Sequence, residues 1–373
     1  MLAAGLAAPS SAQIVVSAND GKVRMLDGAT APLVTPQPDT VTVIDLNASP
    51  PKVLGELRAP TSVVGPPQSV AIAPDESIAL VTAAMKIDPA DGSKLAPDDK
   101  VTVIDLKATP PAVLATLQAG RGASGVSINR AGTLALVANR IEGTVSVFTI
   151  NGKTVAAAGK VDLHAPDSGP SHAVFTPDGR TALVTRNNDH LISVLTVAGT
   201  KVEYAKRDFA AGLKPYSLEI ARAGDVAVVG HSGVGPTGGA DTVGLIDLTA
   251  NPPRTVDQIS AGPTVEGVAL SPDGTAVAAT VMNGSNSPAT SPFFHDYGIL
   301  RVFGISNKRL VPITEARIGH WCQGAAWSRD SRTLLVQCMM EREIRVFRFD
   351  GKRLTPAPSI TINGMPAGIR ASQ

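Results

Sequence analysis

One short unit recurs along this chain of 373 residues. Its clearest copy is Gly267–Thr280, GVALSPDGTAVAAT, in which two apolar runs are joined by Pro272-Asp273-Gly274. Proline presets φ at the first turn position, aspartate bonds its own backbone, and glycine accepts the left-handed conformation that closes a hairpin loop. The unit therefore predicts two adjacent antiparallel strands.

Six complete copies of this unit are visible, and their spacing constrains the fold. Their second residues are Val70, Val126, Ala173, Leu218, Val268 and Ala325. Successive copies are roughly 45 to 57 residues apart, which is too long for a single hairpin. A β repeat of this period is typical of propeller blades with four strands.

A seventh copy is divided between the two ends of the sequence. Gly364–Ile369 matches the entry to a first strand, and Ile14–Asn19 matches a second strand. Pairing these two segments would close the ring and protect the sheet edges. The sequence therefore predicts an all-β, seven-bladed β-propeller of four-stranded antiparallel blades, closed by a blade shared between the termini.

Residues 14–373 are expected to form this one domain, because propellers routinely exceed the usual domain length. The net charge of +1 and the absence of a basic run argue against a nucleic-acid partner. No apolar run approaches the ~20 residues of a membrane span.

Residues 1–13, MLAAGLAAPSSAQ, are small and apolar and end like a signal-peptidase site, although no basic region precedes them. They are interpreted as the remnant of a signal peptide, which implies a periplasmic protein. A frayed N-terminus is the alternative.

Four blades have a long link between their second and third strands. These links are Asn19–Asp39, Met85–Lys100, His231–Asp241 and Met282–Gly298, in blades 1, 2, 5 and 6. All are expected on one face of the disc, where long loops on a rigid scaffold usually carry binding. We expect a cleft on this loop-rich face, walled by blades 1–2 and 5–6, with tolerated insertions as the alternative.

The hairpins and the third strands Val41–Leu46 and Val101–Leu106 resemble those of YVTN-repeat propellers and of the related lactonase-like propellers. The latter include carboxymuconate-cyclising and phosphogluconolactone-hydrolysing enzymes. The entry Pro170–Phe175, with His172, is similar to the histidine-bearing blade entry of that family. There the histidine works with arginines and a glutamate from following blades, whereas this chain has Tyr216, His231 and Met282-Asn283 in the corresponding places.

Polar residues at the blade entries form the predicted site around the mouth of the central channel. His172 and Glu266, the only carboxylate among them, are the candidate acid–base pair. The other candidate ligand-binding residues on the same face are Gln68, Ser124, Tyr216, Gln323, Arg186, Asn188, His231, His295, His320 and Trp321. Structural roles, as turn formers, loop anchors or backbone-bonded histidines, are the alternatives.

Two functions stay open. The first is an exported binding scaffold that holds a small molecule or a periplasmic protein on the loop-rich face. The second is a lactone hydrolase or lactonising cyclase that uses His172 with Glu266. The chain has no phosphate loop, dinucleotide fingerprint or nucleophile elbow, and its histidines lack the spacing of a local metal site, so neither cofactor nor metal is expected.

The two cysteines, Cys322 and Cys338, are predicted to form a disulfide. If Ser328 faces Arg332 across the turn of blade 7, stepping outward along both strands brings Cys322 opposite Cys338. Facing Cα atoms in an antiparallel ladder are ~4.5–5.5 Å apart, within disulfide reach. Two buried free thiols are the alternative.

Overall fold

The structure is a computed structural model that describes residues 13–26, 28–235 and 238–373. The predicted export segment lies outside the described residues except for Gln13. Every regular element in the described residues is a strand. None of them forms a helix long and apolar enough to cross a membrane.

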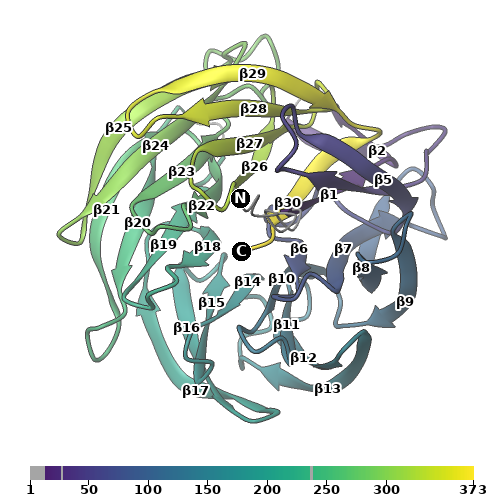
Figure 1. Cartoon of the computed structure of the whole chain (residues 1–373), viewed down its shortest axis with the longest axis vertical. Helices are drawn as coiled ribbons and strands as arrows, with labels where there is room; N and C mark the ends of the chain where they lie inside the picture. Colours follow the sequence, from purple (N-terminus) through teal and green to yellow (C-terminus); the bar gives the residue numbers. More distant parts are fainter. Residues whose placement is uncertain (1–12, 27, 236–237) are drawn as a thin grey trace, which may run out of the picture.

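Seven four-stranded sheets surround a central axis, which confirms the predicted seven-bladed propeller (Figure 1). In each blade the first strand lies nearest the axis and the last forms the rim. Blades 2 to 4 comprise β6 (Val70–Ile72), β7 (Ile78–Ile87), β8 (Leu95–Asp105), β9 (Ala112–Gln118); β10 (Ala123–Ile128), β11 (Leu134–Asn139), β12 (Thr144–Asn151), β13 (Thr154–Asp162); and β14 (Pro170–Phe175), β15 (Thr181–Arg186), β16 (Leu191–Ala198), β17 (Lys201–Ala210). Blades 5 to 7 comprise β18 (Pro215–Ile220), β19 (Val226–His231), β20 (Asp241–Asp247), β21 (Arg254–Gly262); β22 (Val265–Leu270), β23 (Ala276–Val281), β24 (Gly298–Ser306), β25 (Arg309–Ile318); and β26 (Cys322–Trp327), β27 (Thr333–Cys338), β28 (Glu343–Phe349), β29 (Leu354–Thr361).

Blade 1 is built from both ends of the sequence, as predicted. Its order is β30 (Met365–Ala371), β1 (Ile14–Asp20), β4 (Thr40–Asp45) and β5 (Lys52–Arg58). β30 and β1 pair antiparallel with Ser17 opposite Ile369, and Ser372 N donates to Ile14 O at 2.7 Å. The ring is therefore closed by hydrogen bonds within one sheet.

The core lies between neighbouring blades rather than within them. The second strands β11, β19, β23 and β27 are buried at every residue, whereas the rim strands are largely exposed. One apolar cluster joins Val228 and Leu245 of blade 5 to Val268 and Val277 of blade 6. The small aliphatic side chains of the repeat thus pack the sheets of neighbouring blades face to face, the arrangement that excludes water from a propeller.

The four long links take different forms. The blade 1 link contains a hairpin of β2 (Val23–Leu26) and β3 (Ala29–Pro32). The blade 2 link is mostly strand, because β7 and β8 stay paired out to Ile87 and Leu95. In blade 6 the link carries turns and no strand among its described residues.

The connector from blade 1 to blade 2, residues 59–68, leaves the rim and crosses the axis. Gln68 Nε2 donates to Ser217 Oγ of blade 5 at 2.5 Å and to Val268 O of blade 6 at 3.2 Å. A Cβ added at Gly324 of blade 7 would lie 2.8 Å from Pro67. Pro66 and Pro67 cannot donate to a sheet ladder, and β6 begins after them, at Val70. The connector therefore fills the centre of the ring.

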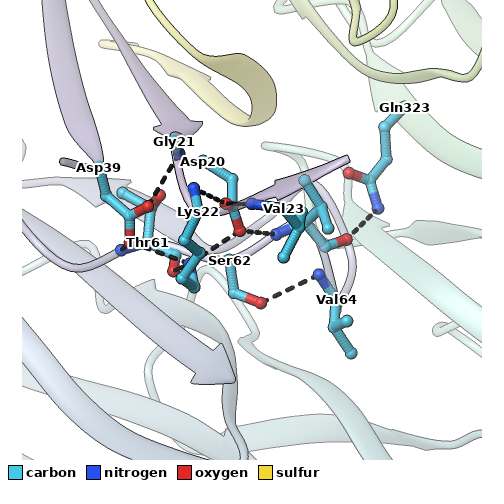
Figure 2. A network of polar contacts seen from close by, with 10 residues as sticks. Asp20, Gly21, Lys22, Val23, Asp39, Thr61, Ser62, Val64 and Gln323 are labelled. Carbon is cyan, nitrogen blue, oxygen red and sulfur yellow. Dashed lines mark hydrogen bonds and ion pairs between the residues drawn. The ribbon is translucent and has the colours of Figure 1, made fainter. Parts of the chain in front are cut away.

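A buried ion cluster anchors this connector to the blade 1 link (Figure 2). Lys22 Nζ lies 2.7 Å from Asp20 Oδ2 and 2.9 Å from Asp39 Oδ2, and it donates to Thr61 O at 2.5 Å. The same carboxylates accept from the backbone of Val63 and Thr61. Every charge in the cluster thus has a partner, and two connector residues are fixed by it.

Candidate functional site

Five of the predicted entry residues meet around the connector at the channel mouth. They are Gln68, Ser124, Tyr216, Glu266 and Gln323. Gln68 is the last residue of the connector, and the other four are each the second residue of an innermost strand. Gln323 Nε2 donates to Gly65 O at 2.8 Å and to Val63 O at 3.3 Å, the latter visible in Figure 2. We call these five residues, with Arg140, the mouth cluster.

Gly65 allows the connector to fit against this cluster. Its φ of +118° is unfavourable for any residue with a side chain, and an added Cβ would lie 2.8 Å from Ser124 Oγ. The Gly65 backbone also contacts the phenol of Tyr216. A residue larger than glycine would separate the connector from blades 3 and 5.

Glu266 is the one carboxylate of the mouth cluster, and it is half-buried. Burial raises the pKa of its carboxyl to about 7, against the opposing effects of Gln323 and Arg140. Gln323 Nε2 lies 3.5 Å from Glu266 Oε2. A carboxyl that titrates near neutral pH can both accept and return a proton in a catalytic cycle.

Arg140 supplies the positive charge of the mouth cluster, and the sequence did not indicate it. It follows β11 in a short link, and its guanidinium carbon lies 5.3 Å from the ring centroid of Tyr216. Nη2 reaches Asn187 Oδ1 at 3.5 Å, whereas the buried Nη1 has no hydrogen-bond partner among the described residues. This nitrogen keeps an unused hydrogen-bond donor, and an anionic group would reach it only if a neighbouring side chain moved.

The Tyr216 side chain is buried, and its ring contacts the Arg140 guanidinium in a cation–π interaction. Burial and the Glu266 charge raise the pKa of its phenol, against the effect of Arg140. The phenol therefore stays protonated at neutral pH. Tyr216 positions the guanidinium and remains a hydrogen-bond donor.

His172 does not open into the mouth, contrary to the expectation for its ring. It is 0% exposed, and it packs against Gly125 of blade 3, where an added Cβ would lie 2.7 Å from the imidazole Cδ2. Its ring nitrogens approach the backbone of Val126 and Leu218 without adequate hydrogen-bond geometry. Burial and Arg370 lower the pKa of His172 to about 3, so the ring is neutral. A catalytic role for His172 stays a prediction, and it would require this packing to open.

Two further predicted residues lie within their own blades and not at the mouth. Arg186 reaches across blade 4, where it pairs with Asp189 and, at 2.9 Å, with Asp208. His231 is 1% exposed, with Nδ1 3.0 Å from Thr242 O. Burial lowers the pKa of His231. Both side chains bond to partners inside their own blade, which explains why neither faces the channel, although Arg186 Nε and His231 Nε2 have no partner among the described residues.

The remaining predicted residues lie on links of the loop-rich face. Asn188 donates to Asp167 O at 2.8 Å, and His295 Nδ1 lies 2.9 Å from Asn283 O. His320 sits between Glu341 and Asp296, at 2.7 Å from each, and these carboxylates raise its pKa despite its partial burial. Trp321 packs on the cluster that contains Val63. These residues hold the links together, and none contacts Glu266 in the described structure.

Cys322 and Cys338 face each other across β26 and β27, which confirms the predicted register. Their sulfurs are 2.05 Å apart and form a disulfide, so the predicted bond is present. Together with Glu341 they are the one group of potential metal ligands found among the described residues. Because the sulfurs are bonded to each other, this group offers no thiolate to a metal.

Two cavities of the described residues lie outside the space between the predicted loop walls. One of about 490 Å³ lies at the boundary of blades 1 and 7, beside the blade 1 link. Another of about 410 Å³ lies at the opposite end of the channel. The expected cleft between two loop walls stays a prediction, and the connector at the centre of the ring limits its depth.

No family model matches the chain, and no curated protein sequence matches it. Solved structures do match. A Bacteroides uniformis protein, provisionally assigned as a 6-phosphogluconolactonase, has a TM-score of 0.74 and 15% identity, over 97% of this chain and 100% of its own. The periplasmic gluconolactonase of Pseudomonas aeruginosa has a TM-score of 0.69 and 17% identity, over 97% and 99%. Hydrazine synthase of Kuenenia stuttgartiensis has a TM-score of 0.64 and 17% identity, over 85% and 92%.

Identities this low establish the fold and not the chemistry, as the hydrazine synthase match illustrates. The predicted resemblance to lactonase-like propellers is confirmed at the level of the fold, over nearly the whole chain. This chain has the seven-bladed architecture of the lactonase-like β-propellers.

Proposed function

We propose that the mouth cluster binds a small lactone that carries a carboxylate and hydrolyses its ester bond. One observation carries this proposal. Glu266, with a pKa of about 7, shares the mouth with Arg140, whose buried Nη1 has no partner among the described residues. This hydrolysis needs a proton acceptor for the attacking water and a cationic hydrogen-bond donor for the substrate carboxylate, and the two residues are of these kinds. The gluconolactonase match supports the same reaction class.

The reaction can be written with the residues of the mouth cluster alone. Ionised Glu266 takes a proton from water as the water oxygen attacks the lactone carbonyl carbon. The bond from that carbon to the ring oxygen then breaks, and protonated Glu266 returns its proton to the ring oxygen. The product is the open hydroxy acid, and Arg140 holds the substrate carboxylate throughout. The connector closes the channel beneath and limits solvent on that side.

A panel of lactones with and without a carboxylate tests the proposal. We expect Glu266→Gln to lower kcat/KM by about 10²–10⁴-fold, the usual contribution of a general base. Arg140→Lys should raise KM for the carboxylate-bearing lactones more than for the neutral ones. Glu203→Gln, at an exposed rim glutamate, is the matched control and should change neither constant.

Full activity in folded Glu266→Gln would disprove this assignment. Loss of turnover in folded His172→Gln, with Glu266→Gln unaffected, would restore His172 as the catalytic residue.

Binding without turnover is the second candidate function. The central connector and the enclosed His172 favour it, because both restrict access to the axis. In that case a ligand should be retained equally by the wild type and by Glu266→Gln in native mass spectrometry, with no lactone turned over by either. A protein partner on the same face stays a prediction. Export to the periplasm also stays a prediction, and the disulfide supports it because such bonds persist in oxidising compartments.

A further inference from the structure

The face opposite the long links carries a regular alternation of side chains. In each complete hairpin the same turn position, directly after the residue whose carbonyl closes the turn, is proline or arginine. From blade 2 to blade 7 the residues at this position are Pro74, Arg130, Pro177, Arg222, Pro272 and Arg329. Proline is favoured here because it presets φ. Arginine does not preset φ, yet it occupies this position in every second blade. Turn geometry therefore does not explain the choice of arginine.

The turns surround the other end of the central channel, where the cavity of about 410 Å³ opens. Arg130, Arg222 and Arg370 line it, together with apolar residues of the first strands such as Ile72 and Val174. The end of the chain lies near the axis in Figure 1, and Gln373 is also part of the lining. We call this space the arginine cavity. Its volume is in the range of small-molecule sites, roughly 300–1,000 Å³.

Positive charge in the arginine cavity is only partly balanced. Glu219 is the one acidic side chain in its lining, and it already pairs with Arg370. Within the described ranges, the hydrogen-bond partner of Arg222 is the neutral Gln373 side chain, which Nε reaches at 3.4 Å. No carboxylate lies within ion-pair distance of Arg130 or Arg222 in the described part of the chain.

The arginines also act on one another. Partial burial, followed by the charges of Arg329 and Arg130, lowers the pKa of Arg222. Arg329 is partly neutralised by Glu76 at 3.3 Å, which leaves Arg130 and Arg222 as the unbalanced pair. Two guanidinium groups that repel each other across a cavity are stabilised by an anion placed between them.

We propose that the arginine cavity binds a small anion with two or more carboxylate or phosphate groups. One group would lie between Arg130 and Arg222, and a second would reach Arg370. Guanidinium forks match both carboxylate and phosphate oxygens, so the geometry selects the charge and not one chemical source. This site is on the opposite face from the mouth cluster and does not depend on lactone hydrolysis.

The turn alternation supplies a sharp test. The double variant Arg130→Pro/Arg222→Pro removes both charges while installing the residue that the other blades use at this position, so the hairpins should fold. Arg130→Gln/Arg222→Gln is a second variant that leaves the backbone unconstrained. The control, Arg207→Gln/Arg254→Gln, removes the same charge from exposed residues of rim strands. Citrate and pyrophosphate are the probes, titrated by calorimetry at physiological ionic strength.

We expect at least one probe to bind the wild type and the control alike. Both cavity variants should bind it at least about tenfold more weakly, which corresponds to about 1.4 kcal/mol. A preference for citrate or for pyrophosphate in the wild type identifies the carboxylate or the phosphate source.

Equal binding by the wild type and by the cavity variants would overturn the proposal, as would equal weakening in the control. Absence of binding by both probes would also overturn it. Polyglutamate is titrated in the same way as a third compound. If it bound and neither small probe did, the ligand would be an acidic protein segment and the small-molecule proposal would be overturned.

Discussion

Glu266 and His172 differ in titration although burial acts on both. Burial favours the neutral form of each, which raises the pKa of the carboxyl to about 7 and lowers that of the imidazole to about 3. Glu266 therefore exchanges a proton near neutral pH, and His172 does not. Of the predicted acid–base pair, only the glutamate is suited to proton transfer under those conditions.

The shifted pKa of Glu266 predicts a pH-dependent stability. Its folded value, about 7, lies above its ordinary value of 4.5, so the folded protein binds more protons than the unfolded chain between these values. The contribution of Glu266 to stability is thus present below about pH 4.5 and is lost as pH rises through about 7. The melting temperature of the wild type minus that of Glu266→Gln should therefore decrease as pH rises from about 4.5 to about 7.

The difference between the two proteins is the diagnostic quantity, because His172 acts in the opposite sense. Its lowered pKa makes the unfolded chain bind the extra proton between about pH 6.5 and 3, so stability falls as pH decreases there. His172 contributes equally to the wild type and to Glu266→Gln and cancels in the comparison. A pH-independent difference in melting temperature would contradict the raised pKa of Glu266.

The sequence predicted part of the mouth cluster, and the misses have identifiable reasons. Gln68, Ser124, Tyr216, Glu266 and Gln323 all stand two residues before the aligned position of their repeat, whereas His172 stands one before it. Since side chains alternate along a strand, that offset could have indicated that His172 points elsewhere. Arg140 had no such signal, because its place depends on contacts with Tyr216, two blades away, and with Asn187 of the next blade.

At the scale of elements, the repeat predicted strands and turns well because the conformation of each hairpin depends on residues that are close in the sequence. The hairpins, the divided blade and the facing cysteines all follow from turn chemistry and alternation. The path of residues 59–68 did not follow from local pattern. It depends on Gln68 bonding to Ser217 of blade 5, on Gln323 of blade 7 bonding to Gly65, and on Lys22 of the blade 1 link bonding to Thr61. These contacts place the connector at the centre of the ring.

The ion cluster around Lys22 should be essential for holding this connector. Lys22 and both carboxylates are close to fully buried, at 10%, 1% and 11% side-chain exposure. Lys22→Met would leave Asp20 and Asp39 facing each other without a cation. Removing one partner of a buried ion pair typically costs about 3–5 kcal/mol, and we expect that loss in urea-induced unfolding.

Lys201→Met is the matched control for this prediction. Lys201 pairs with Glu203 at 2.9 Å on the rim, but both side chains are well exposed, at 70% and 57%. Exposed pairs contribute roughly 0–1 kcal/mol, so this variant should unfold close to the wild type. If Lys22→Met and Lys201→Met lowered the free energy of unfolding by similar amounts, the cluster would not anchor the connector.

At the scale of the whole molecule, the ring is held closed by one strand pair. β30 supplies the innermost strand of blade 1 and buries Met365, Ala367 and Ile369, at 5%, 3% and 1% exposure. Ile369 packs in a cluster shared with blade 7, and Met365 in one that contains Val63 of the connector. β30 therefore joins the first blade, the last blade and the centre of the ring.

Deletion of residues 365–373 should destabilise the entire propeller and not only blade 1. Loss of a single buried Ile or Met side chain costs about 2–5 kcal/mol, so losing the strand should exceed about 5 kcal/mol and approach the stability of many domains. The edge of β1 would also be left unpaired. Thermal unfolding followed by circular dichroism should show a much lower or absent cooperative transition.

A circular permutant separates the effect of closure from that of truncation. Gln13 Nε2 donates to Ser372 O at 3.0 Å, so a short glycine–serine linker can join residues 373 and 13, with new ends opened in the exposed turn at Gly199. This protein keeps β30 and ties it covalently to β1, and it should melt close to the wild type. If the permutant melted as low as the deletion variant, an intact blade 4 hairpin would matter as much as closure. If the deletion variant melted with the wild type, the shared blade would not be what holds the ring together.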